Sequence, residues 1–454
     1  MNIYFKFIYS LMDEENPIQD EISTNCHSKK LYTLNSNDKF TFEFIRYKRS
    51  RRKMIRLNKR IHDKYRIKLA LVFAILLLTM SVSVTWANPK QAKAEWTFMV
   101  YLDADNNLDY FGYQNVEAMS TVGSSQDVNI ITLWDKYDDV ANLYKITKDS
   151  PEIVQGFPLT GTEVNMGDPK TLETFVKYTM KHYKANHYVL VLWDHGDDFR
   201  GCCWDDHPED HLTHQEITHA LSGIQLDILA FDACVEGMIE VVYEYVWDPR
   251  GPQIDYVVAT EGYVPSWGYP YDTILADLAA NPEMNGFDFS KVIVDDYIAY
   301  YETLRPASRL VELASIDLTY IDPIVHQLSD LTDALITMLE EDDEDLDINH
   351  ELIAEARGLG NLGWSQYGWE AYIDLPTFVK SLGIPEALAL YETLTAAVYV
   401  KTTEPMESAE GLGIFFPNSY GSFQNNVYWH GEEYLKVQFP HEGWWEFLQT
   451  YWGI

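Results

Sequence analysis

The sequence predicts an α/β protein in which a mostly parallel sheet is sandwiched between helices. Two observations lead to this fold class. Short apolar runs of strand length recur along residues 96–260, and stretches with apolar residues at helical spacing separate them. Strands that alternate with helices of this length pair in parallel, because each helix returns the chain to the same edge of the sheet.

The predicted elements follow one another regularly from residue 95. Thr213 and Glu216 stand three residues apart as in a capping box, which marks the start of a helix. The predicted strands are 96–102, 128–134, 188–193, 228–231 and 255–260, with a short β excursion at 142–160. The predicted helices are 110–121, 169–184, 213–221, 288–303 and 317–341.

We expect three segments: a presequence at 1–94, a core at 95–345 and a mixed α+β C-terminal subdomain at 346–454. The last segment is rich in aromatic residues, and its pattern predicts helices at 385–400 and 441–452 and a strand at 411–416. Between core and subdomain lies the acidic run EEDDEDLD, from Glu340 to Asp347. We interpret this run as a solvated loop between helices rather than a calcium site.

The first 94 residues have the pattern of a targeting signal. Residues 46–68 hold twelve Lys and Arg, and an uncharged apolar run of 19 residues follows from Leu69 to Ala87. Ala92-Lys93-Ala94 fits a signal-peptidase site, yet 19 apolar residues are also enough to span a bilayer. We therefore expect an exported protein, which is either secreted or anchored at the outer face of the cell membrane through this segment.

The rest of the chain is strongly acidic. Beyond residue 94 it holds 16 of the 34 basic residues and 62 of the 70 acidic ones, which gives a formal charge of about −46. Such a surface argues against nucleic acid as a partner, because phosphate binding needs clustered Lys and Arg. It attracts cationic substrates, and it also serves solubility in general.

Cysteine usage predicts a free thiol. Cys26 lies in the presequence, so the exported part has only Cys202, Cys203 and Cys234. Three thiols cannot all pair within one molecule, and two adjacent cysteines could be bridged only through a strained ring. A disulfide scaffold is therefore excluded.

Two predicted strands end in residues with catalytic chemistry. Cys234 follows the apolar strand 228–231, and His195 follows the strand 188–193. Neighbouring parallel strands would bring both to one carboxyl edge of the sheet, where α/β proteins place their sites. The helical pattern of residues 238–245 would put Cys234 at a helix N-terminus, where the dipole stabilises a thiolate. A cysteine nucleophile needs such a histidine partner.

Six stretches resemble the clostripain-like cysteine peptidases, a branch of the caspase-like group. They are WTFMVYLDADNNLD from Trp96, LWDHG around His195, FDACVEGMIEV around Cys234, ATEGYVPSWGYPYD (259–272), YIDLPTFVKSL (372–382) and GLGIFFP (411–417). They keep the order of the family and cover nearly everything after residue 95. One departure lies at residues 196–201 (GDDFRG), where the family has a glycine-rich stretch. The resemblance implies a caspase-like fold.

The resemblance also implies roles for five residues. Cys234 would attack the scissile carbonyl and His195 would move protons, as a dyad without a third member. Backbone N–H groups at Cys234 and Gly196 would bind the oxyanion, and a side chain at Gly196 would crowd the substrate. Asp232 would be the carboxylate of the S1 pocket, although Asp is also favoured as a helix N-cap. Glu261 is a candidate second acid at the pocket rim.

The predicted function is that of an exported cysteine endopeptidase that cleaves peptides or proteins after basic residues, preferably Arg and less well Lys. We expect a monomer that needs no cofactor or metal. The alternative is a catalytically silent exported binding or adhesion protein on the same scaffold. A zinc site built from His207, His211, His214 and His219 is disfavoured, because their spacing matches no zinc motif. A serine hydrolase is unsupported, because the sequence has no G-x-S-x-G.

Clostripain-like enzymes often mature by cutting themselves between the catalytic His and Cys, after a basic residue. In this chain the 38 residues from Gly196 to Ala233 contain one basic residue, Arg200, only five positions beyond His195. A tether that short cannot deliver Arg200 into the S1 pocket of the same molecule. We therefore expect an enzyme that works as a single chain.

Overall fold

The computed structural model describes residues 93–454, except 138, 306–309, 341–342, 362–370 and 427–430. The chain from Pro89 to Ile454 forms one compact unit. The predicted presequence, including the apolar run from Leu69 to Ala87, therefore lies almost entirely outside the described residues. Within the described part of the chain, no helix combines the length and the apolar character that a membrane crossing needs.

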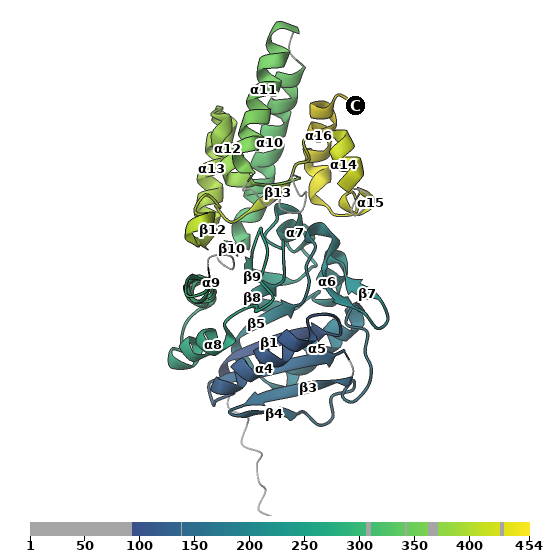
Figure 1. Cartoon of the computed structure of the whole chain (residues 1–454), viewed down its shortest axis with the longest axis vertical. Coiled ribbons are helices and arrows are strands. Elements are labelled where there is room, and N and C mark those ends of the chain that lie inside the picture. Colours follow the sequence, from purple (N-terminus) through teal and green to yellow (C-terminus); the bar gives the residue numbers. More distant parts are fainter. Residues whose placement is uncertain (1–92, 138, 306–309, 341–342, 362–370, 427–430) are drawn as a thin grey trace, which may run out of the picture. The chain divides into compact units, whose positions relative to one another are not determined.

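A sheet of nine strands forms the centre of the described chain (Figure 1). Its five middle strands run parallel, which confirms the predicted fold class. In spatial order they are β9 (Gln253–Ala259), β8 (Gln225–Asp232), β5 (Ala185–Trp193), β1 (Ala94–Ala104) and β2 (Val128–Lys136). Antiparallel pairing adds β10 (Glu312–Asp317) and β12 (Val398–Thr402) beyond β9, and β3 (Asp139–Thr147) and β4 (Ser150–Ile153) beyond β2.

Helices cover both faces of this sheet, as predicted. Successive side chains of a strand point to opposite faces, so Phe98 and Val100 of β1 enter one apolar core while Met99 and Tyr101 enter the other. The first core is closed by α4 (Asp109–Val122), α8 (Tyr271–Ala280) and α9 (Gly286–Glu302). The second is closed by α5 (Pro169–His182), α6 (His214–Ala220), α7 (Ile239–Glu244) and α10 (Ile321–Leu339). Thr213 and Glu216 form the predicted capping box at the start of α6.

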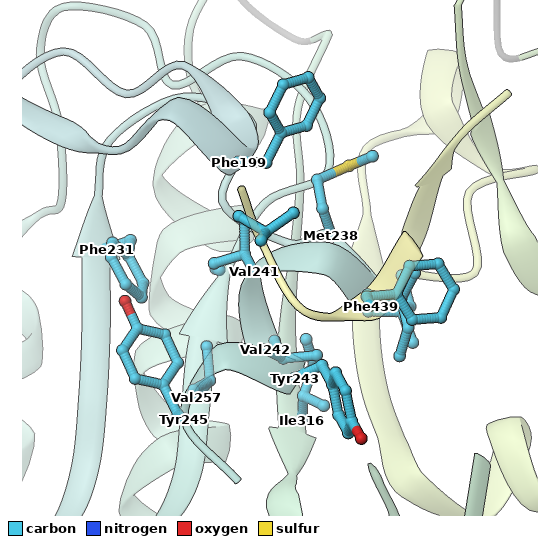
Figure 2. Packing of buried hydrophobic residues seen from close by; sticks show 14 of the residues in the cluster. Phe199, Phe231, Met238, Val241, Val242, Tyr243, Tyr245, Val257, Ile316 and Phe439 are labelled. Carbon is cyan, nitrogen blue, oxygen red and sulfur yellow. The ribbon is translucent and has the colours of Figure 1, made fainter. Parts of the chain in front are cut away.

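Helix α7 is held against β8 by large apolar side chains (Figure 2). The ring centroids of Phe231 on β8 and Tyr245 just after α7 lie 6.2 Å apart. Tyr243, also on α7, contacts Phe439 from the C-terminal part of the chain at 6.4 Å between centroids. The loop between β8 and α7, which contains Cys234, is therefore anchored at both ends in the core.

The chain beyond residue 346 packs on the second core and adds β12 to the main sheet. It also forms a separate antiparallel pair, β11 (Tyr372–Asp374) with β13 (Gly413–Phe415). Its helices are α11 (Asp343–Gly360), α12 (Leu375–Leu382), α13 (Pro385–Ala397), α14 (Tyr420–Asn426), α15 (Gly431–Tyr434) and α16 (Trp444–Trp452). Because Pro89–Ile454 is one compact unit, a separate subdomain at 346–454 stays a prediction.

The prediction of a loop from Glu340 to Asp347 is wrong for most of this run. Helix α10 ends at Leu339 and α11 begins at Asp343, so the second half of the acidic run is helical. The run stands at the N-terminus of α11, where the positive end of the helix dipole favours Asp and Glu. Acidity at a helix start is thus compatible with helix formation, and it does not by itself indicate a loop.

Short elements complete the described chain. The hairpin β6 (Cys202–Asp205) and β7 (Asp210–Leu212) follows the His195 loop. Single 3₁₀ turns are found at η1 (Asp198–Arg200), η3 (Leu318–Tyr320), η5 (Glu404–Met406) and η6 (Phe439–Glu442).

Candidate active site

The loops after β5 and β8 meet at the carboxyl edge of the sheet. The two strands are parallel with Trp193 opposite Asp232, and the N–H of Asp194 donates to the carbonyl of Asp232 at 3.3 Å. His195 and Cys234 each follow two residues later, and both line one cavity of about 140 Å³. The structure thus brings His195, Cys234 and Asp232 together, as the strand-end argument predicted.

The thiol of Cys234 is half-buried and bound to the backbone of the next strand's loop. The N–H of Val264 donates to Sγ at 3.4 Å, and Sγ donates to the carbonyl of Val264 at 3.7 Å. Burial, helped by the carboxylates of Glu236 and Asp232, raises the pKa of Cys234 to about 12, although the hydrogen bond from Val264 acts in the opposite direction. The thiol is therefore protonated in the resting protein at neutral pH.

The prediction that Cys234 lies at a helix N-terminus, where the dipole would stabilise a thiolate, is wrong. Helix α7 begins at Ile239 with Met238 at its N-cap, five residues after Cys234, so its free N–H groups do not reach the thiol. Val235 instead has a positive φ of 60°, which is strained for a β-branched residue. The N–H groups of Val235 and Gly237 donate to the carbonyls of Gly262 and Thr260, both at 2.7 Å. These bonds to the end of β9 hold the strained loop in place.

His195 is oriented by Asn107, a residue that was not predicted from the sequence to belong to the site. Its Nε2 lies 2.8 Å from Oδ1 of Asn107, in the loop after β1. An amide oxygen only accepts hydrogen bonds, so Nε2 carries the proton and Nδ1 has the lone pair in the neutral ring. Burial lowers the pKa of His195, opposed by the charge of Asp206. The position of Asn107 in the sequence could have indicated this contact with His195. Asn107 follows β1, the neighbour of β5 in the sheet.

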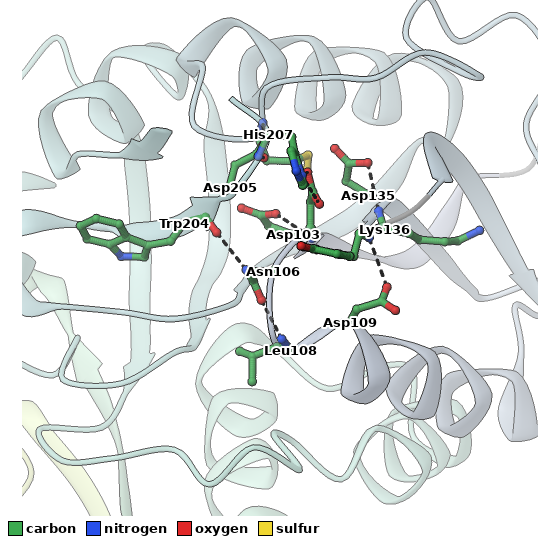
Figure 3. A network of polar contacts seen from close by, with 12 residues as sticks. Asp103, Asn106, Leu108, Asp109, Asp135, Lys136, Trp204, Asp205 and His207 are labelled. Atoms are coloured by element: carbon green, nitrogen blue, oxygen red, sulfur yellow. Dashed lines mark hydrogen bonds and ion pairs between the residues drawn. The ribbon is translucent and has the colours of Figure 1, made fainter. Parts of the chain in front are cut away.

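Asp194, adjacent to His195, has a structural role. Its carboxylate accepts hydrogen bonds from Nδ2 of Asn106, at 2.7 Å, and from the N–H of Trp204. Nδ2 of Asn106 also donates to the carbonyl of Trp204 at 2.9 Å, while its Oδ1 accepts from Leu108 N–H at 2.8 Å (Figure 3). The buried Asp194 therefore fixes the loop after β1 and, through it, the neighbouring Asn107.

Gly196 is required by the packing of the two loops. A Cβ at this position would lie 2.4 Å from the carbonyl oxygen of Cys234 and 2.5 Å from Oε1 of Glu236. The reason predicted from the sequence for this glycine was crowding of the substrate. The structure gives a different one, because the space for a side chain is filled by the Cys234 loop.

Asp232 is buried and belongs to the lining of the same cavity. Its Oδ2 accepts hydrogen bonds from the N–H of Tyr269 at 3.0 Å and from the hydroxyl of Tyr271 at 2.9 Å, while its Oδ1 accepts none from the described residues. Gly268 passes directly over the carboxylate, and a Cβ there would lie 2.6 Å from Oδ2. Burial raises the pKa of Asp232 to about 7. Asp232 ends β8 and does not cap α7, so the alternative N-cap role is wrong.

The structure does not bring Glu261 into this cavity. Glu261 is buried beyond the end of β9, where its Oε1 accepts from the N–H of Gly411 at 3.2 Å. Burial and the neighbouring carboxylates of Asp374 and Glu312 raise its pKa well above the ordinary value. Among the described residues that line the cavity, Glu261 does not appear. Its contacts point to docking of the segment before β13.

The histidines considered for zinc bind separate partners. Nδ1 of His207 lies 3.0 Å from the carboxylate of Asp105, and His211 stacks on Trp204 with centroids 4.0 Å apart. The fully buried His214 lies 3.2 Å from the carboxylate of Glu236. In the described ranges no group of three or more His, Cys, Asp or Glu has an arrangement that could hold a metal ion.

These features define an α/β protein with a thiol, an imidazole and a buried carboxylate around one cavity at the carboxyl edge of its sheet. The chain belongs to the clostripain family, whose model matches residues 100–422. Clostripain from Hathewaya histolytica is 33% identical over 242 residues, a match that covers 45% of this chain and 46% of that protein. The match thus spans about half the length of this relative.

Two solved structures share the fold. An inactive protease zymogen from Parabacteroides distasonis is 19% identical, with a TM-score of 0.60 over 77% of this chain and 98% of that one. A secreted cysteine protease from Bacteroides thetaiotaomicron, solved in complex with an irreversible peptide inhibitor, is also 19% identical. Its TM-score is 0.59 over 78% of this chain and 99% of that one. At this identity the likeness supports the caspase-like fold alone.

Proposed function

We propose that the protein is a cysteine endopeptidase that cleaves after Arg or Lys. The observation that carries this proposal is the single cavity lined by Cys234, His195 and Asp232, in which Oδ1 of the buried Asp232 accepts no hydrogen bond from the described residues. A buried acceptor without a donor is costly, and a cationic side chain of a substrate would supply that donor. The thiol and imidazole line the same cavity.

The chemistry follows from the resting protonation states. As Sγ of Cys234 attacks the scissile carbonyl, its proton passes to Nδ1 of His195, the ring nitrogen with the lone pair. The C–N bond then breaks, His195 returns the proton to the leaving amine, and water hydrolyses the thioester. The N–H groups of Cys234 and Gly196 are the proposed donors to the oxyanion. Transfer within a neutral pair avoids placing an isolated thiolate next to Asp232 and Glu236.

We further infer that the protein is exported and acts on peptides or proteins outside the cytoplasm. The basic stretch at 46–68 and the apolar run from Leu69 to Ala87 support this inference, and the acidic remainder fits cationic substrates. Both a cleaved and an anchored form agree with this pattern. We expect a monomer without nucleic-acid partners.

Peptide hydrolysis by alanine variants tests the catalytic pair. Cys234→Ala and His195→Ala should each abolish turnover of a P1-Arg peptide, with far-UV circular dichroism and the melting temperature unchanged. The matched control is Cys203→Ala, since Cys203 is fully buried and lies outside the cavity lining. Activity that survives in Cys234→Ala and disappears in Cys203→Ala would overturn the assignment. A thiol-reactive arginyl probe should label Cys234, whereas a silent binding protein would stay unlabelled.

The S1 role of Asp232 has a separate test. Asp232→Asn should lower kcat/KM for P1-Arg peptides on the order of 10²-fold or more, because a desolvated charge pair loses one partner. Equal cleavage of P1-Arg and P1-Leu peptides by the unmodified protein would show that Asp232 does not select the substrate.

A further inference from the structure

Three aromatic side chains form an accessible surface beside the candidate active site. Trp267 is 44% exposed and Tyr110 is 61% exposed, while Phe111 is half-buried. The ring of Phe111 contacts both of the others edge to face, with centroids 5.3 Å from the ring of Trp267 and 5.3 Å from that of Tyr110. We call these three side chains the aromatic surface. Adjacent exposed aromatic side chains indicate a binding surface, whereas single ones are common on any protein.

The aromatic surface is joined to the cavity by two segments of the chain. Ser266 and Gly268, the chain neighbours of Trp267, both line the cavity. Leu108 lines it as well, and this residue is the N-cap of α4, whose first turn carries the other two aromatic side chains. An extended peptide advances about 3.3 Å per residue, so a residue that flanks one seated in the cavity comes within reach of the aromatic surface.

The backbone that carries Trp267 is fixed to the rest of the site. The N–H of Gly268 donates to the carbonyl of Pro265 at 2.8 Å, which closes a turn around Trp267. Nδ2 of Asn115, on α4, donates to the carbonyl of Trp267 at 3.1 Å. Oδ1 of Asn115 accepts from Nε1 of Trp193, a residue of the cavity lining, at 2.7 Å. The aromatic surface is therefore preorganised beside the cavity, which lowers the entropy cost of binding.

An apolar side chain is the ligand that this surface favours. The rings of Trp267 and Phe111 offer apolar area, and a second apolar side chain that covers them removes water from both partners. A cation over the exposed ring of Trp267 would gain less, because a cation–π contact at an exposed site contributes less than burial of a large apolar side chain.

We propose that the aromatic surface is a second substrate subsite, which binds an apolar side chain that flanks the P1 residue, and that Trp267 determines its specificity. This proposal rests on the proposed peptidase function and deepens it. The substrate class is a peptide in which a basic P1 residue has a large apolar neighbour such as Phe or Leu. Asp232 selects the P1 residue by charge, whereas the subsite selects the neighbour by apolar area, so the two preferences can be measured separately.

Peptides that keep Arg at P1 and differ only in a flanking residue test the subsite. One set varies the residue before Arg and a second set the residue after it, each with Phe, Leu, Ala and Asp. In one of the sets Phe and Leu should raise kcat/KM on the order of tenfold over Ala, and Asp should lower it. Ratios of Phe over Ala below about threefold in both sets would overturn the proposal and leave the peptidase function intact. Failure to cleave any of these peptides would refute the peptidase function itself.

Variants of Trp267 show whether this residue causes the preference. Trp267→Ala should bring the Phe/Ala ratio close to one, whatever its absolute rates, and Trp267→Phe should keep part of the preference. The matched control is Trp247→Ala. Trp247 is 40% exposed and precedes Gly251, whose carbonyl accepts from the N–H of Gly223 just before β8, at the edge of the sheet opposite to Cys234. Its ratio should equal that of the unmodified protein. A preference that survives in folded Trp267→Ala, or that falls equally in Trp247→Ala, would refute the role of Trp267.

Discussion

In the resting protein Cys234 is a neutral thiol and His195 is a neutral imidazole. Burial raises the pKa of the thiol to about 12 and lowers the pKa of the imidazole, so both groups are uncharged at neutral pH. The two pKa values move in opposite directions for one reason: burial disfavours the charged form, which is the thiolate of Cys234 and the imidazolium of His195. Geometry then matters more than resting charge: the imidazole has to present Nδ1, and the only described side chain that fixes its other nitrogen is Asn107.

Two substitutions of Asn107 test this orienting role. Asn107→Ala should lower kcat on the order of tenfold with little change in KM, because the imidazole loses the acceptor that selects its tautomer. Asn107→Asp keeps an acceptor and adds a negative charge, which should raise the pKa of His195 and move the acid limb of kcat/KM to higher pH. Steady-state kinetics between pH 5 and 9 measure both effects. Equal losses in the two variants, with no movement of the limb, would show a purely structural role.

The pKa of Asp232 predicts a second pH effect. A carboxyl whose pKa is raised to about 7 is protonated below that pH, so it loses its attraction for a P1 cation as the pH falls. We expect kcat/KM for P1-Arg and P1-Lys peptides to rise with pH through about 7. In Asp232→Asn this limb should be absent, and any remaining acid limb belongs to His195. A single limb near pH 4 in the unmodified protein would contradict the prediction.

The strand ends were predictable, and the loops between them were not. Alternating apolar runs and helical spacing placed His195 and Cys234 after two parallel strands, and parallel pairing alone brings them to one edge. The contacts of Asn107 with His195 and of Tyr271 with Asp232 could not be predicted, because they join residues 88 and 39 positions apart in the sequence. The late start of α7 was not predicted either. Residues 238–245 have a helical pattern, but nothing in the local sequence shows that the turn at Val235 separates Cys234 from the helix. Glu261 was wrongly predicted to lie at the pocket rim, because its burial depends on a contact with Gly411, which is distant in the sequence.

A buried ion pair joins the Cys234 loop to helix α6. Glu236 follows Cys234 by two residues, and its Oε2 lies 3.2 Å from Nε2 of His214 at the start of α6; both side chains are fully buried. Nδ1 of His214 lies 2.8 Å from the hydroxyl of Tyr245. Burial would lower the pKa of His214, but Glu236 raises it above the ordinary value. The pair thus ties the Cys234 loop to α6, while Glu236 also fills the space beside Gly196.

Breaking this pair should destabilise the protein without altering the residues that line the cavity. Glu236→Gln and His214→Gln should each lower the free energy of unfolding by about 3 kcal/mol or more, because each leaves an uncompensated buried group. The double variant should lose clearly less than the sum of the two. Urea unfolding of the four proteins at pH 7 gives the coupling. Losses that add within about 0.5 kcal/mol would show that the two side chains do not support each other.

The charge of the whole chain bears on what it can cut, including itself. Only 16 of the 34 basic residues follow Ala94, against 62 acidic ones, so an enzyme directed at Arg and Lys finds few targets on its own surface. Between His195 and Cys234 the one basic residue is Arg200. Its guanidinium donates to the carboxylate of Asp197 at 2.6 Å and lies 4.9 Å over the ring of Trp204. Both contacts oppose release of Arg200 from its loop.

We therefore predict that the protein works as a single chain. A cut after Arg200 would require this residue to leave Asp197 and Trp204 and enter the S1 pocket from a tether of five residues, and loops that short cannot make the reversal. Purified wild type and Cys234→Ala should give the same single band on a denaturing gel and the same intact mass, apart from any loss of the N-terminal segment. Arg200→Gln serves as the matched control, since it removes the one basic site and leaves Cys234 in place. Two fragments that join at Arg200 in the wild type, and that are missing from both variants, would show that this enzyme processes itself.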